Sequence, residues 1–281
     1  MICIGMGNEG ASAGHTAGIL KENTEERIPL AVQMKETAIN VQIWKSYHDI
    51  VDISLISPAG VQIGPIPEVI GTQRFVVGDT EILLYYGEPS PFHVSQEIFI
   101  EFLPKDSYIT PGIWQFVLTP RKIVTGEYDL WLPSENVLNR GTAFRYPTER
   151  GTLTIPSTSQ RVISVGAYDS LTFAYADFSG RGGLEGESKP DLVAPGVDIT
   201  APTPSGIYQT FTGTSFATPF VSGAAALMME WGIVRGNDPY LYGEKVKAYL
   251  RRGARPLPGF TEYPNPQVGY GALCLRDSLP E

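Results

Sequence analysis

The 281-residue sequence contains few cysteines and less positive than negative charge, and each shortage excludes a class of protein. Two cysteines, Cys3 and Cys274, are too few for a disulfide-built fold, and their apolar neighbours favour burial as small hydrophobic residues. Twenty-one Lys and Arg against 30 Asp and Glu give a net charge of −9, which argues against nucleic acid and anionic membrane surfaces as partners. We also find no apolar run of the roughly 20 residues that a membrane span requires.

The remaining composition is that of a folded protein with many turns. Hydrophobic residues make up 42% and charged residues 18% of the chain, which is the balance of a globular domain. Thirty glycines and 23 prolines favour short strands and turns over helix bundles. The length allows one large or two ordinary domains.

One segment places a candidate nucleophile, Ser215, at the start of a helix of small residues. Gly213 permits a tight turn, and Thr214 and Ser215 are residue types that favour helix N-termini. We expect Pro219 in the first turn, where a missing N–H is tolerated. Residues 221–231 are small or apolar, which predicts a helix buried on most sides. Taken alone, the pattern also fits an ordinary N-cap serine, but a serine at this place also meets the positive end of the helix dipole.

The residues around Ser215 resemble a known catalytic motif. Residues 213–226 read Gly-Thr-Ser-Phe-Ala-Thr-Pro-Phe-Val-Ser-Gly-Ala-Ala-Ala, which resembles the nucleophile motif of the subtilisin-like serine proteases, or subtilases. Phe216 stands where this family usually has Met. Further segments resemble other blocks of the family in the expected order: residues 7–10, 161–169, 177–182, 189–199 and 264–271.

This resemblance implies a role for each matching residue. Ser215 would be the nucleophile, and the Asn8 side chain with a backbone N–H would form the oxyanion hole. Met6 is larger than the residue often found at its place in the family, which predicts a narrower substrate pocket. The residues implied in substrate binding are Gly5, Met6, Gly7 and Thr214.

The catalytic base is missing from the matched segments. In subtilases the Asp and His of the triad both precede the oxyanion asparagine, whereas only seven residues precede Asn8. The chain also opens directly into an apolar run at residues 2–4, so we expect the N-terminal part of a larger protein to be absent. None of the three histidines is predicted to be the base: we place His15 in a Gly-rich loop, and His48 and His93 on the surface of a β region.

That β region occupies the middle of the sequence. Short runs of alternating polarity, such as Ile39-Asn40-Val41-Gln42-Ile43, are separated by turn residues, which favours an antiparallel sandwich or jelly roll. Simple subtilases have a short connection here, so the region is predicted to be an insertion, and the arrangement resembles the Csp-type subtilases of spore-forming Clostridia. The expected domains are a subtilase segment at 1–25, an inserted β domain at 26–135, and a second subtilase segment at 136–281.

The predicted fold class is therefore α/β, a partial subtilisin-like parallel sheet with helices, interrupted by an all-β domain. We expect strands near 162–165 and 192–193 and a helix over 242–252, with an apolar face at Val246, Tyr249 and Leu250. Half of a parallel sheet leaves an open edge, so the chain should pair with the missing half or with a second copy.

The predicted function is the C-terminal portion of a serine endopeptidase, acting on proteins or peptides through an acyl-enzyme and inactive without the missing residues. No cofactor is expected, and no acidic cluster has the spacing of a calcium site. A first alternative is a non-catalytic subtilase-like protein of germination signalling or assembly, and the resemblance implies a spore-associated or secreted protein. A second is a carbohydrate- or partner-binding role for the β insertion.

A third alternative is nucleotide binding. Residues 5–10 have the spacing G-x-G-x-x-G after an apolar run, which is the dinucleotide fingerprint. That fingerprint should open a helix, whereas residues 11–18 contain two glycines and β-type sequence follows. Nucleotide binding is therefore the least favoured hypothesis.

Overall fold

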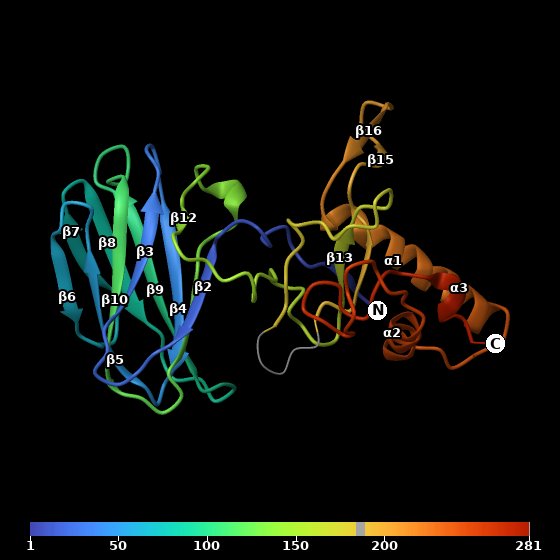
Figure 1. Cartoon of the computed structure of the whole chain (residues 1–281), viewed down its shortest axis with the longest axis horizontal. Coiled ribbons are helices and arrows are strands. Elements are labelled where there is room, and N and C mark those ends of the chain that lie inside the picture. The colour runs from blue at the N-terminus through green and yellow to red at the C-terminus, as the bar shows by residue number, and fades with distance from the viewer. Residues whose placement is uncertain (184–188, 281) are drawn as a thin grey trace. The chain divides into compact units, whose positions relative to one another are not determined.

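The computed structural model describes residues 1–183 and 189–280, and these form two compact units (Figure 1). The sandwich unit comprises residues 12–148, and the α/β unit comprises residues 1–11 together with the chain from residue 149 onward. The chain therefore leaves the α/β unit after Ala11 and returns to it at Glu149, as expected for an inserted domain.

The sandwich unit is made of two antiparallel sheets. Its elements are β2 (His15–Ile19), β3 (Glu26–Val32), β4 (Ile39–Ser46), β5 (Ile50–Ile56), β6 (Gln62–Ile66), β7 (Gln73–Val77), β8 (Thr80–Tyr86), β9 (Ser95–Pro104), β10 (Gly112–Lys122), β11 (Glu127–Trp131), the 3-10 helix η1 (Glu135–Val137) and β12 (Ala143–Phe144). The strand orders are β12-β3-β10-β5-β6 and β2-β11-β4-β9-β8-β7. Because both sheets contribute to one buried cluster, they pack face to face.

Alternation along the strands explains this core. In β4, Ile39, Val41 and Ile43 are buried while the residues between them are partly exposed, as the sequence pattern predicts for strands with one solvated face. Trp114 and Phe116 of β10 enter the same core, where each packs edge-on against Phe102. The predicted sandwich is thus confirmed.

The sandwich unit extends beyond the predicted bounds of 26 and 135. On the N-terminal side, β2 pairs with β11, and on the C-terminal side β12 pairs with β3. Both strands lie outside the strongly alternating region, and a two-residue strand such as β12 has no periodicity to detect. Their hydrogen bonds to distant strands attach residues 12–25 and 136–148 to this unit.

One carboxylate, Asp49, ties the β4–β5 turn to the start of β11. It is 1% exposed, and its oxygens accept hydrogen bonds from the N–H groups of Val124, Thr125 and Gly126 and from the Thr125 hydroxyl. Burial acts to raise the pKa of Asp49, but these donors outweigh it and hold the pKa below its ordinary value.

Asp49→Asn is therefore expected to destabilise the sandwich unit by about 2 kcal/mol at neutral pH, because an ionised acceptor with several donors is lost. The stabilisation is complete above the ordinary pKa of 3.8 and disappears as the pH falls through the lower folded-state value. Urea unfolding followed by tryptophan fluorescence measures this, since three of the four tryptophans lie in residues 12–148. The matched control is Asp52→Asn, at an exposed pair with Arg121, which should change stability by less than about 0.5 kcal/mol. Equal effects of Asp49→Asn at pH 7 and pH 3 would contradict the assignment.

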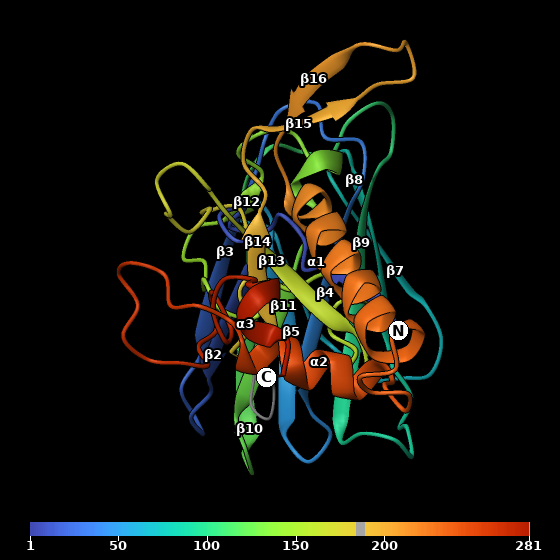
Figure 2. The ribbon, with the colours of Figure 1, turned by 90° about the vertical axis from the view of Figure 1, so that its right-hand side faces the viewer.

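The α/β unit contains a three-stranded parallel sheet of order β1-β13-β14. Its strands are β1 (Cys3–Gly5), β13 (Ile163–Tyr168) and β14 (Leu192–Pro195), and a separate antiparallel ribbon is formed by β15 (Ile199–Pro202) and β16 (Tyr208–Phe211). Helix α1 (Thr214–Met229) continues into the π-helical turn η2 (Glu230–Val234) and is followed by α2 (Gly243–Arg252) and α3 (Leu275–Ser278). Figure 2 shows α1 in front of this sheet, with the ribbon projecting beyond the end of the helix.

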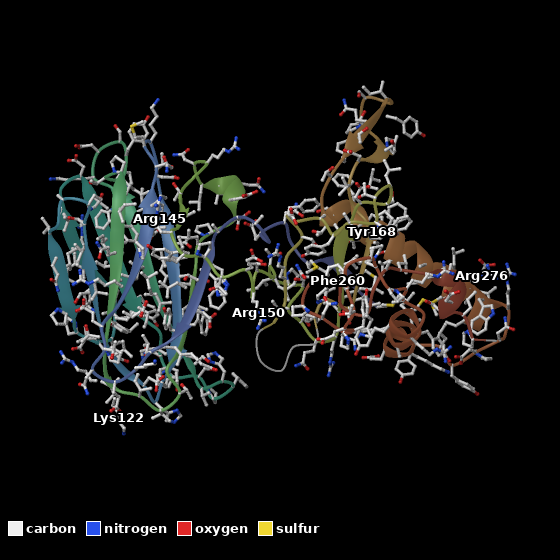
Figure 3. The ribbon with its side chains drawn as sticks, in the orientation of Figure 1. Lys122, Arg145, Arg150, Tyr168, Phe260 and Arg276 are labelled. Atoms are coloured by element: carbon white, nitrogen blue, oxygen red, sulfur yellow. The ribbon has the colours of Figure 1, made fainter. Side chains whose placement is uncertain are left out.

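Two apolar clusters hold the α/β unit together. All six residues of β13 are buried, which fits a central parallel strand covered on both faces. The larger cluster joins β13 and β14 to α1 and α2, whereas the smaller one gathers Tyr168, Val193 and Leu257, against which Phe260 packs (Figure 3). The predicted helix over 242–252 is confirmed as α2, and its Val246 and Leu250 are buried.

Helix α1 differs from the prediction because only one face of it is buried. Residues on that face, such as Ala217, Val221 and Ala225, pack against the sheet, whereas Phe220 and Leu227 on the other face are 43% and 54% exposed. By length and composition alone, the helical segment Thr214–Val234 is long and apolar enough to cross a membrane. The sequence predicts no such span, because its uninterrupted apolar runs are shorter than about 20 residues. The packing of α1 against the sheet is the arrangement of a core helix with one face uncovered.

One further expectation for this region, the placement of Pro219 in the first turn, is wrong. Pro219 lies inside α1, in its second turn, because the helix begins at Thr214; the proline therefore supplies no N–H for the Ser215 carbonyl. The dinucleotide fingerprint at residues 5–10 is followed by irregular backbone and then by β2, so no helix N-terminus is available to hold a pyrophosphate.

Candidate active site

The side chain of Asn8 meets the start of α1, although 206 positions separate the two in sequence. The backbone N–H of Thr214 donates a hydrogen bond to Asn8 Oδ1 at 3.0 Å, and the Thr214 hydroxyl donates to the same oxygen at 3.1 Å. Thr214 is 2% exposed, so both bonds are largely shielded from water. The two segments that carry the predicted oxyanion asparagine and nucleophile are therefore brought together.

These contacts orient the amide of Asn8. A backbone N–H can only donate, so the Asn8 atom facing Thr214 must be the oxygen, and the Nδ2 group must point the other way. A Cβ atom on Gly213, the N-cap of α1, would stand 3.3 Å from Nδ2. Gly213 also has a φ angle of 151°, a backbone conformation that residues other than glycine rarely adopt. Glycine here leaves Nδ2 free to donate to another group.

Ser215 is the second residue of α1 and is exposed. The N-cap is Gly213, and no side-chain hydrogen bond caps the helix, so the alternative of Ser215 as an N-cap is wrong. The next residue, Phe216, stacks on Phe211 at the end of β16 with ring centroids 4.9 Å apart and planes 13° apart. The hydroxyl is thus accessible beside a rigid aromatic pair, at the positive end of a 16-residue helix.

The segment before Asn8 packs closely against α1 and β13. A Cβ atom on Gly5 would stand 3.0 Å from Thr214 Oγ1, so any side chain here would require Thr214 to shift. Backbone groups of Met6 and Gly7 are bonded within the unit: Met6 N–H donates to the Val165 carbonyl at 3.0 Å, and the Gly7 carbonyl accepts from Gly180 at 3.0 Å. These bonds fix the position of Asn8.

The predicted effect of Met6 on a substrate pocket is wrong. Its side chain is fully buried. Its sulfur packs so closely on β13 that a Cβ atom on Gly166 would come within 2.6 Å of it. A side chain without accessible surface lines no solvent-filled pocket, so the larger residue fills the space beside β13 and cannot narrow a substrate site.

All three histidines belong to the sandwich unit. His48 and His93 are exposed, as predicted. His15 is not in a loop: it lies in β2, is 2% exposed, stacks on Trp131 with ring centroids 4.7 Å apart, and its Nε2 is 2.8 Å from Asp129 Oδ1. Within the α/β unit the side chains at the Ser215 site therefore include no imidazole that could take its proton.

Sequence reasoning singles out neither Phe211 nor the contact between Asn8 and Thr214. Phe211 ends a ribbon with no strong apolar pattern, and the contact depends on a pairing across the whole insertion. Among residues 1–183 and 189–280, no group of three or more His, Cys, Asp or Glu side chains is placed to hold a metal ion.

Comparison with known proteins agrees with this geometry. Residues 146–271 match the model of the subtilase family. The serine protease AprX of Bacillus subtilis is 34% identical over 150 residues, which are 46% of this chain and 32% of AprX, and an intracellular serine protease of Paenibacillus polymyxa is 38% identical over 105 residues, 36% of this chain and 30% of that protein. In the solved structure of the CspB protease of Clostridium perfringens, 99% of this chain superposes on 58% of that chain with a TM-score of 0.91 and 40% identity. The matched part of the chain thus spans about a third of AprX and of the Paenibacillus protease.

Proposed function

We propose that this chain, which belongs to the subtilase family of serine proteases, is the C-terminal portion of an endopeptidase that cleaves peptide bonds through an acyl-enzyme. The observation that carries the proposal is the contact of Asn8 with Thr214, because it places an amide donor beside the residue that precedes an exposed serine at a helix N-terminus. Protein or peptide substrates follow from the proteases to which the chain is similar.

In this proposal each residue has a separate task. The Ser215 oxygen attacks the carbonyl carbon of the substrate, and the carbonyl oxygen acquires negative charge. Asn8 Nδ2 and the backbone N–H of Ser215 donate hydrogen bonds to that oxygen, and the helix dipole adds further stabilisation. A histidine must take the serine proton, and an aspartate must orient the histidine. Both residues would come from a segment upstream of residue 1, so we propose that the chain alone is inactive.

The surface of the α/β unit supports such an upstream partner. Among the described residues no strand pairs with the outer edge of β1, and Met1 and Ile2 beside it are 50% and 60% exposed. On the uncovered face of α1, the apolar side chains of Phe220 and Leu227 are also exposed. An open parallel edge and an apolar helix face are the surfaces that a further βα layer would bury. The upstream half of the protease domain is the proposed occupant, and a second copy of this chain is the alternative.

Substitution of Asn8 tests the proposed oxyanion role in an N-terminally extended form that carries the Asp and His motifs. Asn8→Asp keeps an acceptor for both Thr214 donors but removes the Nδ2 donor, so it should leave the melting temperature nearly unchanged. Its kcat for a peptide substrate should fall by about 10²–10³-fold, with little change in KM, as when the oxyanion donor of subtilisin is removed. Asn8→Ala loses both functions and should reduce stability as well as kcat.

The comparison of these two variants separates catalysis from structure. If Asn8→Asp retained full kcat, the proposed role of Asn8 Nδ2 as an oxyanion-hole donor would be wrong. If the extended protein cleaved no peptide although it contained all triad residues, the non-catalytic alternative of a signalling or assembly protein would be favoured.

A further inference from the structure

Three solvent-accessible aromatic side chains lie on the outer face of the six-stranded sheet in the sandwich unit. The strands β4, β9 and β8 of this sheet are neighbours (Figure 1), and Phe99 of β9 stands directly opposite Gln42 of β4 on one side and Tyr85 of β8 on the other. Trp44 of β4 stands opposite Glu97 of β9. Because directly opposite residues share a face of the sheet, these five side chains belong to one surface.

The central strands of the other sheet place their aromatic residues differently. The two aromatic residues of β3, β5 and β10 are Trp114 and Phe116, and both lie in the core of the sandwich. Aromatic side chains carry large apolar surfaces, and their gathering on one solvated face is typical of a surface that a ligand covers. The difference between the two sheets therefore indicates that the outer face of β4, β9 and β8 is a binding surface.

Two carboxylates flank the central aromatic ring of this surface. Glu97 and Glu101 stand two positions before and after Phe99 in β9, so both share its face and each is about 7 Å from it along the strand. Within residues 1–183 and 189–280, we find no Lys or Arg side chain that pairs with either of them. Two unneutralised negative charges beside an aromatic ring complement a ligand that carries positive charge.

The backbone and one ring contact restrict what this surface can recognise. Strand β9 is paired with β4 on one side and with β8 on the other, so its backbone groups are used within the sheet and a ligand meets side chains only. A peptide that adds a strand needs a free sheet edge, which this central position does not offer. The Trp44 ring lies 5.7 Å from the His93 ring, whose Nδ1 is 2.8 Å from the Ser95 carbonyl oxygen. These contacts hold the Trp44 ring before a ligand binds.

We propose that the outer face of β4, β9 and β8 binds a polysaccharide that carries free amino groups. The apolar C–H face of a sugar ring packs flat on an aromatic ring such as Phe99 or Tyr85, and the Gln42 amide can both donate to and accept from sugar hydroxyls. Ammonium groups of the sugar pair with Glu97 and Glu101, which would repel an acidic glycan. The surface extends about 10 Å across three strands and about 14 Å along β9, so it holds more than one sugar ring. This inference does not depend on hydrolytic activity.

Isothermal titration of the full chain with two matched oligosaccharides tests the proposal. The first is a β-linked hexamer of glucosamine, and the second is the corresponding hexamer of N-acetylglucosamine, in which a neutral amide replaces each ammonium group. The glucosamine hexamer should bind saturably, and the acetylated hexamer should bind at least about 10-fold more weakly, because it lacks charge-assisted hydrogen bonds to the carboxylates. The affinity for the glucosamine hexamer should fall as sodium chloride is added, since these carboxylates are accessible to solvent.

Two pairs of variants locate the binding surface. Phe99→Ala and Glu97→Gln should each weaken binding of the glucosamine hexamer by about 5–10-fold, because one removes an aromatic contact and the other a charge. The controls are Tyr240→Ala and Glu262→Gln, at an exposed aromatic residue and an exposed carboxylate of the α/β unit, and both should bind like the wild type. Glu262→Gln loses the same charge as Glu97→Gln, so it also measures attraction by the net charge alone.

A melting temperature is measured for each variant, and Glu97→Gln remains the test if Phe99→Ala does not fold. Equal affinity of the wild type for both hexamers, absence of saturable binding, or unchanged affinity of Glu97→Gln would overturn the proposal. A hexalysine peptide provides the last comparison. If it bound as tightly as the glucosamine hexamer and with no loss in Phe99→Ala, the surface would recognise charge alone, which contradicts sugar binding.

Discussion

The 281-residue chain by itself is expected to hydrolyse peptides at least about 10⁶-fold more slowly than an N-terminally extended form that carries the Asp and His motifs of the family. The reason is chemical: Ser215 is exposed at the start of α1, but its hydroxyl is a weak nucleophile until a base takes the proton. Loss of the histidine in subtilisin reduces kcat by a factor of this size. Turnover of a peptide substrate and labelling by a fluorophosphonate measure the difference.

A matched set of samples identifies the cause. Ser215→Ala in the extended form should show neither turnover nor labelling, whereas Ser222→Ala, at an exposed serine on the same helix, should behave like the wild type. Mixing the chain with a separately produced upstream segment should restore labelling if that segment docks on β1 and α1. Labelling of the isolated chain at Ser215 at the rate of the extended form would show that the base lies within the 281 residues.

The largest expected loss of stability comes from Asp191→Ala. This change removes the only carboxylate that we find in contact with Lys189, Lys247 and Arg251 within the described residues, and so leaves one buried and two partly buried positive charges without it. Breaking a buried ion pair by removing one partner typically reduces stability by about 3–5 kcal/mol, because the remaining charge stays desolvated. Urea unfolding monitored at 222 nm reports this, since the helices of eight or more residues all lie in the α/β unit.

Two further variants bound this result. Asp191→Asn retains one side-chain oxygen, which can accept either from Ser164, the donor to Asp191 Oδ2, or from the cations, but not from both. It also lacks the negative charge, so its loss should be large but smaller than that of Asp191→Ala. Asp277→Ala, at the exposed pair with Arg255, should leave the urea midpoint unchanged. A midpoint for Asp191→Ala close to that of the wild type would show that the carboxylate does not hold these cations together.

Much of the fold and of the candidate site could be read from local patterns. Alternating apolar residues predicted the sandwich strands because each strand has one buried and one solvated face. The small-residue run after Ser215 predicted α1, and the apolar face of residues 242–252 predicted α2. These are short-range regularities, so they need no knowledge of the partner elements.

The errors concern positions whose surroundings come from far along the chain. His15 looked like a loop residue because Gly14 and Gly18 lie close to it in sequence, but Asp129 and Trp131, more than 110 positions away, bury it. Met6 looked like a pocket residue, but β13 takes its side chain into the core. Helix α1 looked buried all round because its composition does not reveal which neighbours are present.

By itself, the order of residues determined the family motif at Ser215, the strand pattern of the sandwich and the helices, because these depend on side chains a few positions apart. Only the tertiary structure decided that Asn8 Oδ1 accepts from Thr214, that Gly213 leaves Nδ2 open, and that Lys189, Lys247 and Arg251 all reach Asp191. Those contacts join segments separated by tens to hundreds of residues. Their formation depends on how sheets and helices pack, which no local regularity encodes.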